Sequence, residues 1–95
     1  MSQFVKLREL INEAKKDPKN NEFFRKVISQ AIALDVMNER MMARYFCVSL
    51  PTIGRWKEGE SAPHPCGRPS VYRIIYQSVC TTIRRRRESY DDYTD

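Results

Sequence analysis

One stretch decides the fold of this chain: residues 42–59 read Met-Ala-Arg-Tyr-Phe-Cys-Val-Ser-Leu-Pro-Thr-Ile-Gly-Arg-Trp-Lys-Glu-Gly. Ser49 is a preferred N-cap residue, and Pro51 follows it in the first turn of a helix, where the missing N–H group costs nothing. Gly59 suits the left-handed residue that commonly ends a helix. The stretch therefore predicts a short helix over residues 50–58, preceded by a tight turn.

Three further helices are predicted upstream of this stretch, because apolar residues recur at helical spacing between polar capping residues. The polar linker around Pro18 separates the first two of them, since proline interrupts a helix. We expect the helices over residues 2–16, 21–34 and 39–46, each starting at a residue that can cap it: Ser2, Asn21 and Asn38.

Downstream, residues 59–69 contain two glycines and three prolines and are predicted to form a loop. A last helix is expected over 70–87, starting at Pro69 or Ser70, with one apolar stripe formed by Val71, Ile74, Ile75, Val79 and Ile83. The acidic residues 88–95 are expected to fray. The predicted fold class is all-α: a compact bundle of about five helices in a single domain, residues 1–95, with no strand.

The composition supports one small folded domain. The chain has 95 residues, of which 41% are hydrophobic and 31% charged, close to an ordinary globular protein. The apolar runs are too short to span a bilayer, and the first residues lack the order of a signal peptide. We expect no membrane insertion and a location in the cytoplasm. The odd number of cysteines, three, also favours a reducing compartment.

The net charge of +5 is unevenly distributed. Residues 1–49 carry nine basic and six acidic side chains, residues 50–87 carry eight and two, and residues 88–95 carry four acidic and no basic ones. The middle and late part of the chain is therefore where a polyanion would bind.

Two short helices joined by a tight turn are typical of a helix-turn-helix. Residues 23–63 resemble the lambda-repressor-like (Cro/C1-type, XRE) family of DNA-binding domains, whose pattern has a small residue in the first helix and then Val-Ser and Thr-Ile-x-x-Trp-x-x-Gly. In that pattern Ala43 lies where the helices cross, Val48 fills the turn, and Ile53 and Trp56 anchor the second helix. Cys47 departs from the family, which usually has glycine in the turn.

The resemblance implies that residues 50–58 read the major groove of double-stranded DNA. Ile53 and Trp56 face inward, so the neighbouring positions face outward. The implied base-contacting residues are Leu50, Pro51, Thr52, Arg55 and Glu58. Arg55 can grip a guanine with two donors, and Leu50 or Pro51 can lie against a thymine methyl group. Contacts to the DNA backbone, with about four to six phosphates, are expected from Arg44, Ser49, Lys57, His64, Arg68 and Arg73.

Other features are open to two interpretations. Arg84–Arg87 could contact phosphates or only stabilise a helix end and face the acidic tail. The helix over 2–16 and the stripe of the last helix could be core or a homodimer surface. His64 and the cysteines Cys47, Cys66 and Cys80 lack metal-ligand spacing, so we expect no metal; Cys47 and Cys80 are interpreted as small buried hydrophobic residues. No catalytic motif, cofactor or small-molecule site is indicated.

The sequence thus predicts a sequence-specific DNA-binding transcriptional regulator, not an enzyme, with repression by occlusion as the default mechanism. The competing interpretation is a protein-binding module on the same scaffold, such as an antitoxin or a phage adaptor, motivated by Glu58, Glu60 and the acidic tail. A third is non-specific, architectural DNA binding.

Overall fold

Five α-helices make up most of the chain in the computed structural model, which describes residues 2–94, with side chains described for residues 2–86. Between residues 2 and 94 there is no strand, so the predicted all-α class is confirmed. The helices are α1 (Gln3–Lys16), α2 (Asn21–Ala33), α3 (Glu39–Phe46), α4 (Leu50–Glu58) and α5 (Arg68–Thr94), and a 3-10 helix, η1 (Pro65–Gly67), precedes α5.

Three of the predicted N-caps are confirmed. The side chains of Ser2, Asn38 and Ser49 each accept a hydrogen bond from the backbone N–H three residues later. The fourth prediction was wrong by one residue: Asn20 caps α2, with its Oδ1 3.0 Å from the N–H of Phe23. Asn21 does not cap α2, because its Oδ1 accepts a hydrogen bond from Arg68, 47 residues further along the chain.

Left-handed backbone conformations mark the ends of two short helices. Gly59 ends α4 at φ 81°, as predicted. Cys47 ends α3 at φ 57° and ψ 44°, which is also left-handed. Asp35, shortly before α3, also has φ 57°. Outside glycine this conformation is uncommon and carries a steric cost.

The last helix is longer than predicted at both ends. It begins at Arg68, directly after η1, rather than at Pro69 or Ser70. It continues through residues 88–94, which were expected to fray, to Thr94. No glycine or proline occurs after Pro69, so nothing in the sequence interrupts the hydrogen-bond ladder once the helix has started.

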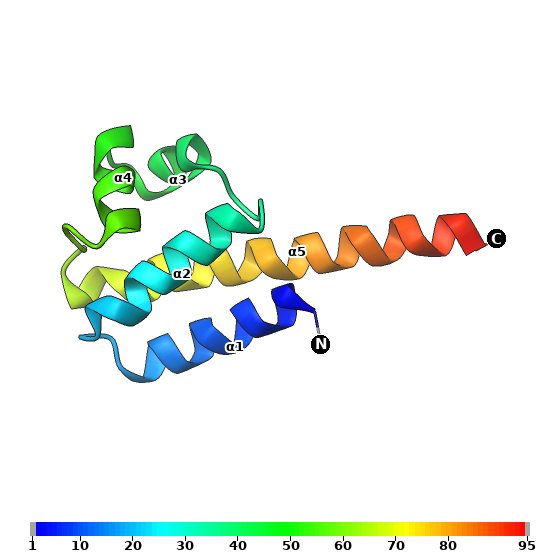
Figure 1. Cartoon of the computed structure of the whole chain (residues 1–95), viewed down its shortest axis with the longest axis horizontal. Coiled ribbons are helices and arrows are strands. Elements are labelled where there is room, and N and C mark those ends of the chain that lie inside the picture. The colour runs from blue at the N-terminus through cyan, green and yellow to red at the C-terminus, as the bar shows by residue number, and fades with distance from the viewer. Residues whose placement is uncertain (1, 95) are drawn as a thin grey trace.

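The core lies where α2 meets the other helices. α1 packs against α2 and α5, and α4 packs against α2 and α3. Figure 1 shows α3 and α4 together at one end of the molecule, on the opposite side of α2 from α1. Aromatic rings join these helices. The ring centroid of Phe24 in α2 lies 5.3 Å from that of Trp56 in α4 and 6.0 Å from that of Tyr72 in α5. The ring centroid of Phe46 in α3 lies 6.3 Å from that of Trp56.

None of the described helices is both long enough and apolar enough to cross a membrane. One expectation about the cysteines was wrong. Cys47 is exposed, because the left-handed turn lifts it out of the packed face of α3, whereas Cys80 is half-buried on α5.

Candidate nucleic-acid interface

The turn between α3 and α4 is three residues long, Cys47 to Ser49. Within it, the N–H of Val48 donates to the carbonyl of Ala43 at 3.0 Å, which closes the end of α3. Ala43, Phe46 and Val48 are half-buried and pack against the core. The short turn and these contacts fix α4 relative to α3.

The two faces of α4 differ sharply. Ile53 is fully buried and Trp56 is 5% exposed, as predicted. Away from the buried side, Leu50 is 43% exposed, and Pro51, Arg55 and Glu58 are also exposed. Three of the five predicted base-contacting residues, Pro51, Arg55 and Glu58, therefore share one accessible face of one helix, with a single cation, Arg55, and Leu50 flanks this face.

Thr52, the fifth of these residues, is half-buried and already engaged. Its hydroxyl lies 2.8 Å from the hydroxyl of Ser49, and its backbone N–H donates to the same oxygen. The Ser49 hydroxyl is thus used in capping α4. What remains available at this helix start is the methyl group of Thr52 and the uncapped N–H groups of the first turn, which are a favourable place for an anion.

Arg44 is exposed on α3, as a contact to the DNA backbone requires. The sequence reasoning missed Arg40, which lies four residues earlier on the same face of α3. Arg40 lines one hollow together with Arg44 and another together with Leu50, so it bridges α3 and the start of α4. Its spacing from Arg44 was the signal that could have identified it.

Lys57 is not simply a solvent-facing cation. It is half-buried, and its Nζ lies 3.5 Å from Oε1 of Glu39 at the start of α3. The carbonyl of Lys57 also accepts a hydrogen bond from the hydroxyl of Ser29 on α2, at 3.1 Å. A phosphate would have to compete with Glu39 for this lysine.

The expectation for Arg68 was wrong. This side chain is 3% exposed and cannot reach a phosphate. Its guanidinium donates to the carbonyl of Pro63 at 2.9 Å, to the carbonyl of Pro18 at 2.8 Å and to Oδ1 of Asn21 at 2.6 Å. It also lies 5.5 Å from the ring centroid of Phe24. Arg68 joins two loops to the start of α5.

Two other predicted backbone contacts lie outside α3 and α4. His64 is exposed in the loop after α4, and its Nδ1 accepts a hydrogen bond from the N–H of Cys66, at 3.2 Å, which caps η1. Arg73 is exposed on α5, which packs against α1 and α2. Arg44 lies on α3, which packs against α4, whereas His64 and Arg73 lie on other segments.

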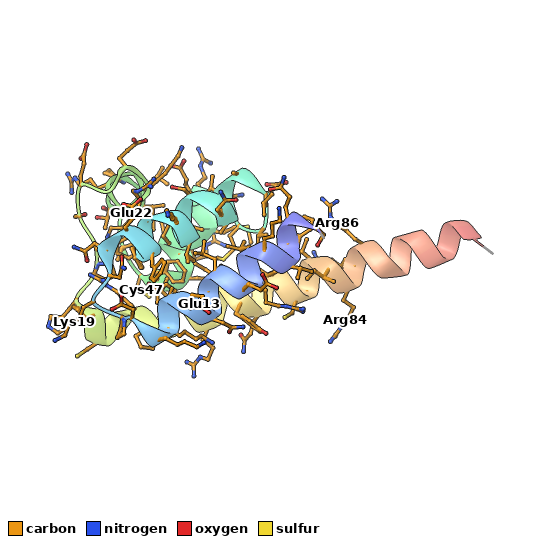
Figure 2. The ribbon with its side chains drawn as sticks, turned by 60° about the horizontal axis from the view of Figure 1, so that its bottom comes forward. Glu13, Lys19, Glu22, Cys47, Arg84 and Arg86 are labelled. Atoms are coloured by element: carbon orange, nitrogen blue, oxygen red, sulfur yellow. The ribbon has the colours of Figure 1, made fainter. Side chains whose placement is uncertain are left out.

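The arginines at positions 84–87 of α5 do not all point the same way. Figure 2 shows Arg84 and Arg86 extending from opposite sides of α5. The guanidinium carbon of Arg86 lies 4.6 Å from the ring centroid of Phe4 in α1, a stacking contact that joins the two helices. Arg86 therefore has a structural contact, and Arg87 lies outside the residues with described side chains.

The charge on the α3–α4 unit, residues 39–60, is modest. This unit contains four basic and three acidic residues, so its net charge is +1. The basic residues are Arg40, Arg44, Arg55 and Lys57, and the acidic residues are Glu39, Glu58 and Glu60. Among the described residues, no group of three or more His, Cys, Asp or Glu side chains could hold a metal ion.

No family model matches this chain, and comparisons with curated proteins and with solved structures gave no match either.

Proposed function

We propose that this chain is a sequence-specific DNA-binding protein, a transcriptional regulator of the bacterial or phage type that reads the major groove with α4. The division of α4 into two faces carries the proposal. Ile53 and Trp56 hold the helix in the core, whereas Pro51 and Arg55 are accessible on its other side and Leu50 is accessible at the edge of that side. A major groove admits one α-helix presented in this way. The resemblance of residues 42–59 to the lambda-repressor-like pattern gives further support.

Each exposed residue has a chemical role in this proposal. Arg55 donates two hydrogen bonds to O6 and N7 of a guanine, a contact worth about 1–3 kcal/mol of discrimination. Leu50, Pro51 and the methyl group of Thr52 form an apolar edge for a thymine methyl, because the Thr52 hydroxyl is occupied by Ser49. Glu58 can accept a hydrogen bond from a cytosine amino group.

Phosphate contacts come from fewer residues than the sequence suggested. Arg40, Arg44 and the first turn of α4 are on or beside the exposed face, whereas Arg68 is buried and Lys57 is paired with Glu39. With about three phosphates neutralised, the logarithm of the binding constant should fall by roughly 2.7 for each tenfold increase in salt concentration.

The test is selection from a pool of random DNA duplexes at two salt concentrations. The wild-type protein should enrich a short sequence motif, and Arg55→Ala should lose the guanine preference and bind the selected site about tenfold or more weakly. Arg8→Ala is the matched control, because it removes one arginine from α1, which lies on the opposite side of α2 from α4. This control should bind the selected site like the wild-type protein.

A protein-binding role remains the second candidate, and the modest charge of the α3–α4 unit favours it. The three carboxylates in residues 39–60 repel phosphate groups, and they would attract a basic surface of a protein partner. If the wild-type protein enriches no sequence and binding disappears at moderate salt, sequence-specific DNA reading is contradicted and protein partners are the next to test.

A further inference from the structure

A groove of about 340 Å³ lies between α3 and α5. It stays open because α3 packs against α4 and not closely against α5. Met41 and Tyr45 of α3 form one wall. The other wall is the part of α5 between Ile74 and Arg85. We call this hollow the α3–α5 groove.

Exposed large hydrophobic side chains are concentrated beside this groove. In the described part of the chain they are Met41, Tyr45 and Leu50. The first two, which are 40% and 57% exposed, line the groove. Neighbouring exposed apolar side chains mark interaction surfaces. The groove therefore offers apolar surface that a partner can cover.

The α5 wall contributes methyl groups to this surface. The hydroxyl of Thr81 donates to the carbonyl of Gln77 at 3.0 Å. The hydroxyl of Thr82 donates to the carbonyl of Ser78 at 2.9 Å. Because both hydroxyl protons are used inside the helix, the threonines present their methyl groups to an occupant rather than a free donor. Together with Ile74, this wall suits the apolar side of a partner.

The rim of the groove is positively charged. Arg85 lines the groove itself, and a second hollow of about 260 Å³, which shares both α3 side chains with it, is lined by Arg40 and Arg44. None of the described residues that line the two hollows is acidic. The carboxylate that α3 carries, on Glu39, is paired with Lys57 of α4. An occupant of this surface therefore has to bring negative charge.

An amphipathic helix with an acidic polar side meets both requirements in one element. Its apolar side chains recur at i, i+3, i+4 and i+7, so they can enter a groove together while the carboxylates stay at the rim. A nucleic-acid backbone supplies negative charge but no apolar side chains to cover Met41 and Tyr45. The combination of apolar walls and a basic rim thus favours a protein helix over nucleic acid.

We propose that the α3–α5 groove is the docking site for an acidic amphipathic helix of a second protein. Its apolar side chains cover Met41 and Tyr45. Its carboxylates pair with Arg85, Arg40 and Arg44. The last two arginines also contact phosphates in the proposed function, so an occupied groove withholds them from DNA. This competition rests on the proposed DNA binding, whereas the docking itself does not.

Selection from a displayed library of random peptides tests the docking on the full chain. Peptides of about 16 residues are long enough for four helical turns. The wild-type protein should enrich peptides that carry a net negative charge and apolar residues at helical spacing. One enriched peptide is then synthesised with a fluorescent label, and fluorescence anisotropy gives its Kd for the wild-type protein and for each variant.

Two matched pairs of variants locate the bound peptide. Tyr45→Ala should raise the Kd at least about tenfold, whereas Leu50→Ala, which removes an exposed side chain outside the groove, should change it less than about twofold. Arg85→Glu should also raise the Kd at least about tenfold. Arg84→Glu makes the same change in charge at an exposed neighbour that does not line the groove, and it should bind like the wild-type protein. Circular dichroism verifies that all four variants fold.

Competition is measured with the same peptide and the DNA duplex that the wild-type protein selects. A saturating amount of peptide should displace the duplex, and a complex that holds both would contradict the competition. A wild-type protein that selects no duplex contradicts the proposed function, while the peptide measurements still decide the docking. The two proposals therefore fail separately.

Three results would overturn the docking. The first is a selection that enriches no acidic amphipathic peptide. The second is a Tyr45→Ala or Arg85→Glu variant that binds the enriched peptide like the wild-type protein, because the peptide then lies elsewhere. The third is peptide binding that is lost whenever sedimentation shows the chain to be self-associated, because a second copy then covers the groove.

Discussion

The ring of Trp56 meets the ring of Phe24 edge-on, with centroids 5.3 Å apart and planes inclined at 78°. Aromatic pairs favour this geometry, because the positive edge of one ring faces the negative face of the other. Phe24 also contacts Tyr72 of α5 and the guanidinium of Arg68. The orientation of α4 therefore depends on α2 and, through Phe24, on the start of α5.

Replacing Trp56 tests this dependence. Trp56→Ala should lower the free energy of unfolding by about 3–5 kcal/mol, because it removes a buried ring and leaves a cavity beside Phe24. Leu50→Ala, at an exposed position of the same helix, should change it by less than about 0.5 kcal/mol. Urea denaturation followed by far-ultraviolet circular dichroism measures both values, and equal values would contradict the two-faced description of α4.

Gly54, inside α4, and Gly59, at the end of α4, should change the stability in opposite directions when each is replaced by alanine. Gly59→Ala should destabilise the protein by about 1–2 kcal/mol, because an L-residue at φ 81° is strained. The added Cβ would also lie 2.8 Å from Cδ of Arg25. Gly54→Ala should stabilise it by about 0.5–1 kcal/mol, because Gly54 lies inside the helix with open space around its Cβ position.

The Arg25 side chain has to shift in the Gly59 variant to make room for the added Cβ. Its guanidinium forms a hydrogen-bonded ion pair with Glu22, and this hydrogen bond lowers the pKa of the Glu22 carboxyl below its usual value. Thermal unfolding of the two glycine variants provides the comparison. A stabilising Gly59→Ala change would show that the left-handed end of α4 is not required.

Arg68 should behave as a structural residue in spite of its charge. Arg68→Met should lower the free energy of unfolding by about 3 kcal/mol, because it leaves the carbonyls of Pro18 and Pro63 without their donors. Arg73→Met, five residues further along α5 and exposed, should change it by less than about 0.5 kcal/mol. Chemical denaturation of both variants checks this contrast, which equal losses would contradict.

Tyr72 should make the fold sensitive to alkaline pH. Burial raises the pKa of its phenol above the ordinary value; the charge of Arg68 opposes this shift and that of Asp17 adds to it. The unfolded chain therefore loses this proton first, so the stabilisation is complete below about pH 10 and is lost as pH rises through the folded pKa.

The variant Tyr72→Phe isolates this effect. The phenol oxygen is buried without a hydrogen-bond partner among the described residues, so its removal should change the stability by less than about 1 kcal/mol at neutral pH. The stability difference between pH 7 and about pH 11 should be smaller in the variant than in the wild-type protein. Identical pH profiles would contradict a raised pKa at Tyr72.

Much of the fold follows from local signals in the sequence. The caps Ser2, Asn38 and Ser49 and the left-handed Gly59 were predicted correctly, because each depends on residues within one helical turn. The end of α5 was not, because the acidic composition of residues 88–94 suggested fraying although no breaker interrupts them.

The non-local features could not be predicted. Arg68 looked like one more surface cation, since its partners at Pro18 and Asn21 are 50 and 47 residues away in the sequence. Asn21 was predicted to cap α2, and its hydrogen bond with the distant Arg68 could not be read from the local sequence. The pairing of Lys57 with Glu39 likewise depends on how α3 and α4 pack.

The short helix α3 lies between two left-handed residues, Asp35 and Cys47, and its fully buried residue is Met42. By contrast, α2 has four buried residues, Phe24, Val27, Ile28 and Ala31. Segments with few buried contacts open without global unfolding. The amide hydrogens of α3 should therefore exchange with deuterated solvent faster than those of α2, which mass spectrometry can resolve by peptide. Local unfolding of α3 would then release the turn between α3 and α4 while the other helices stay folded.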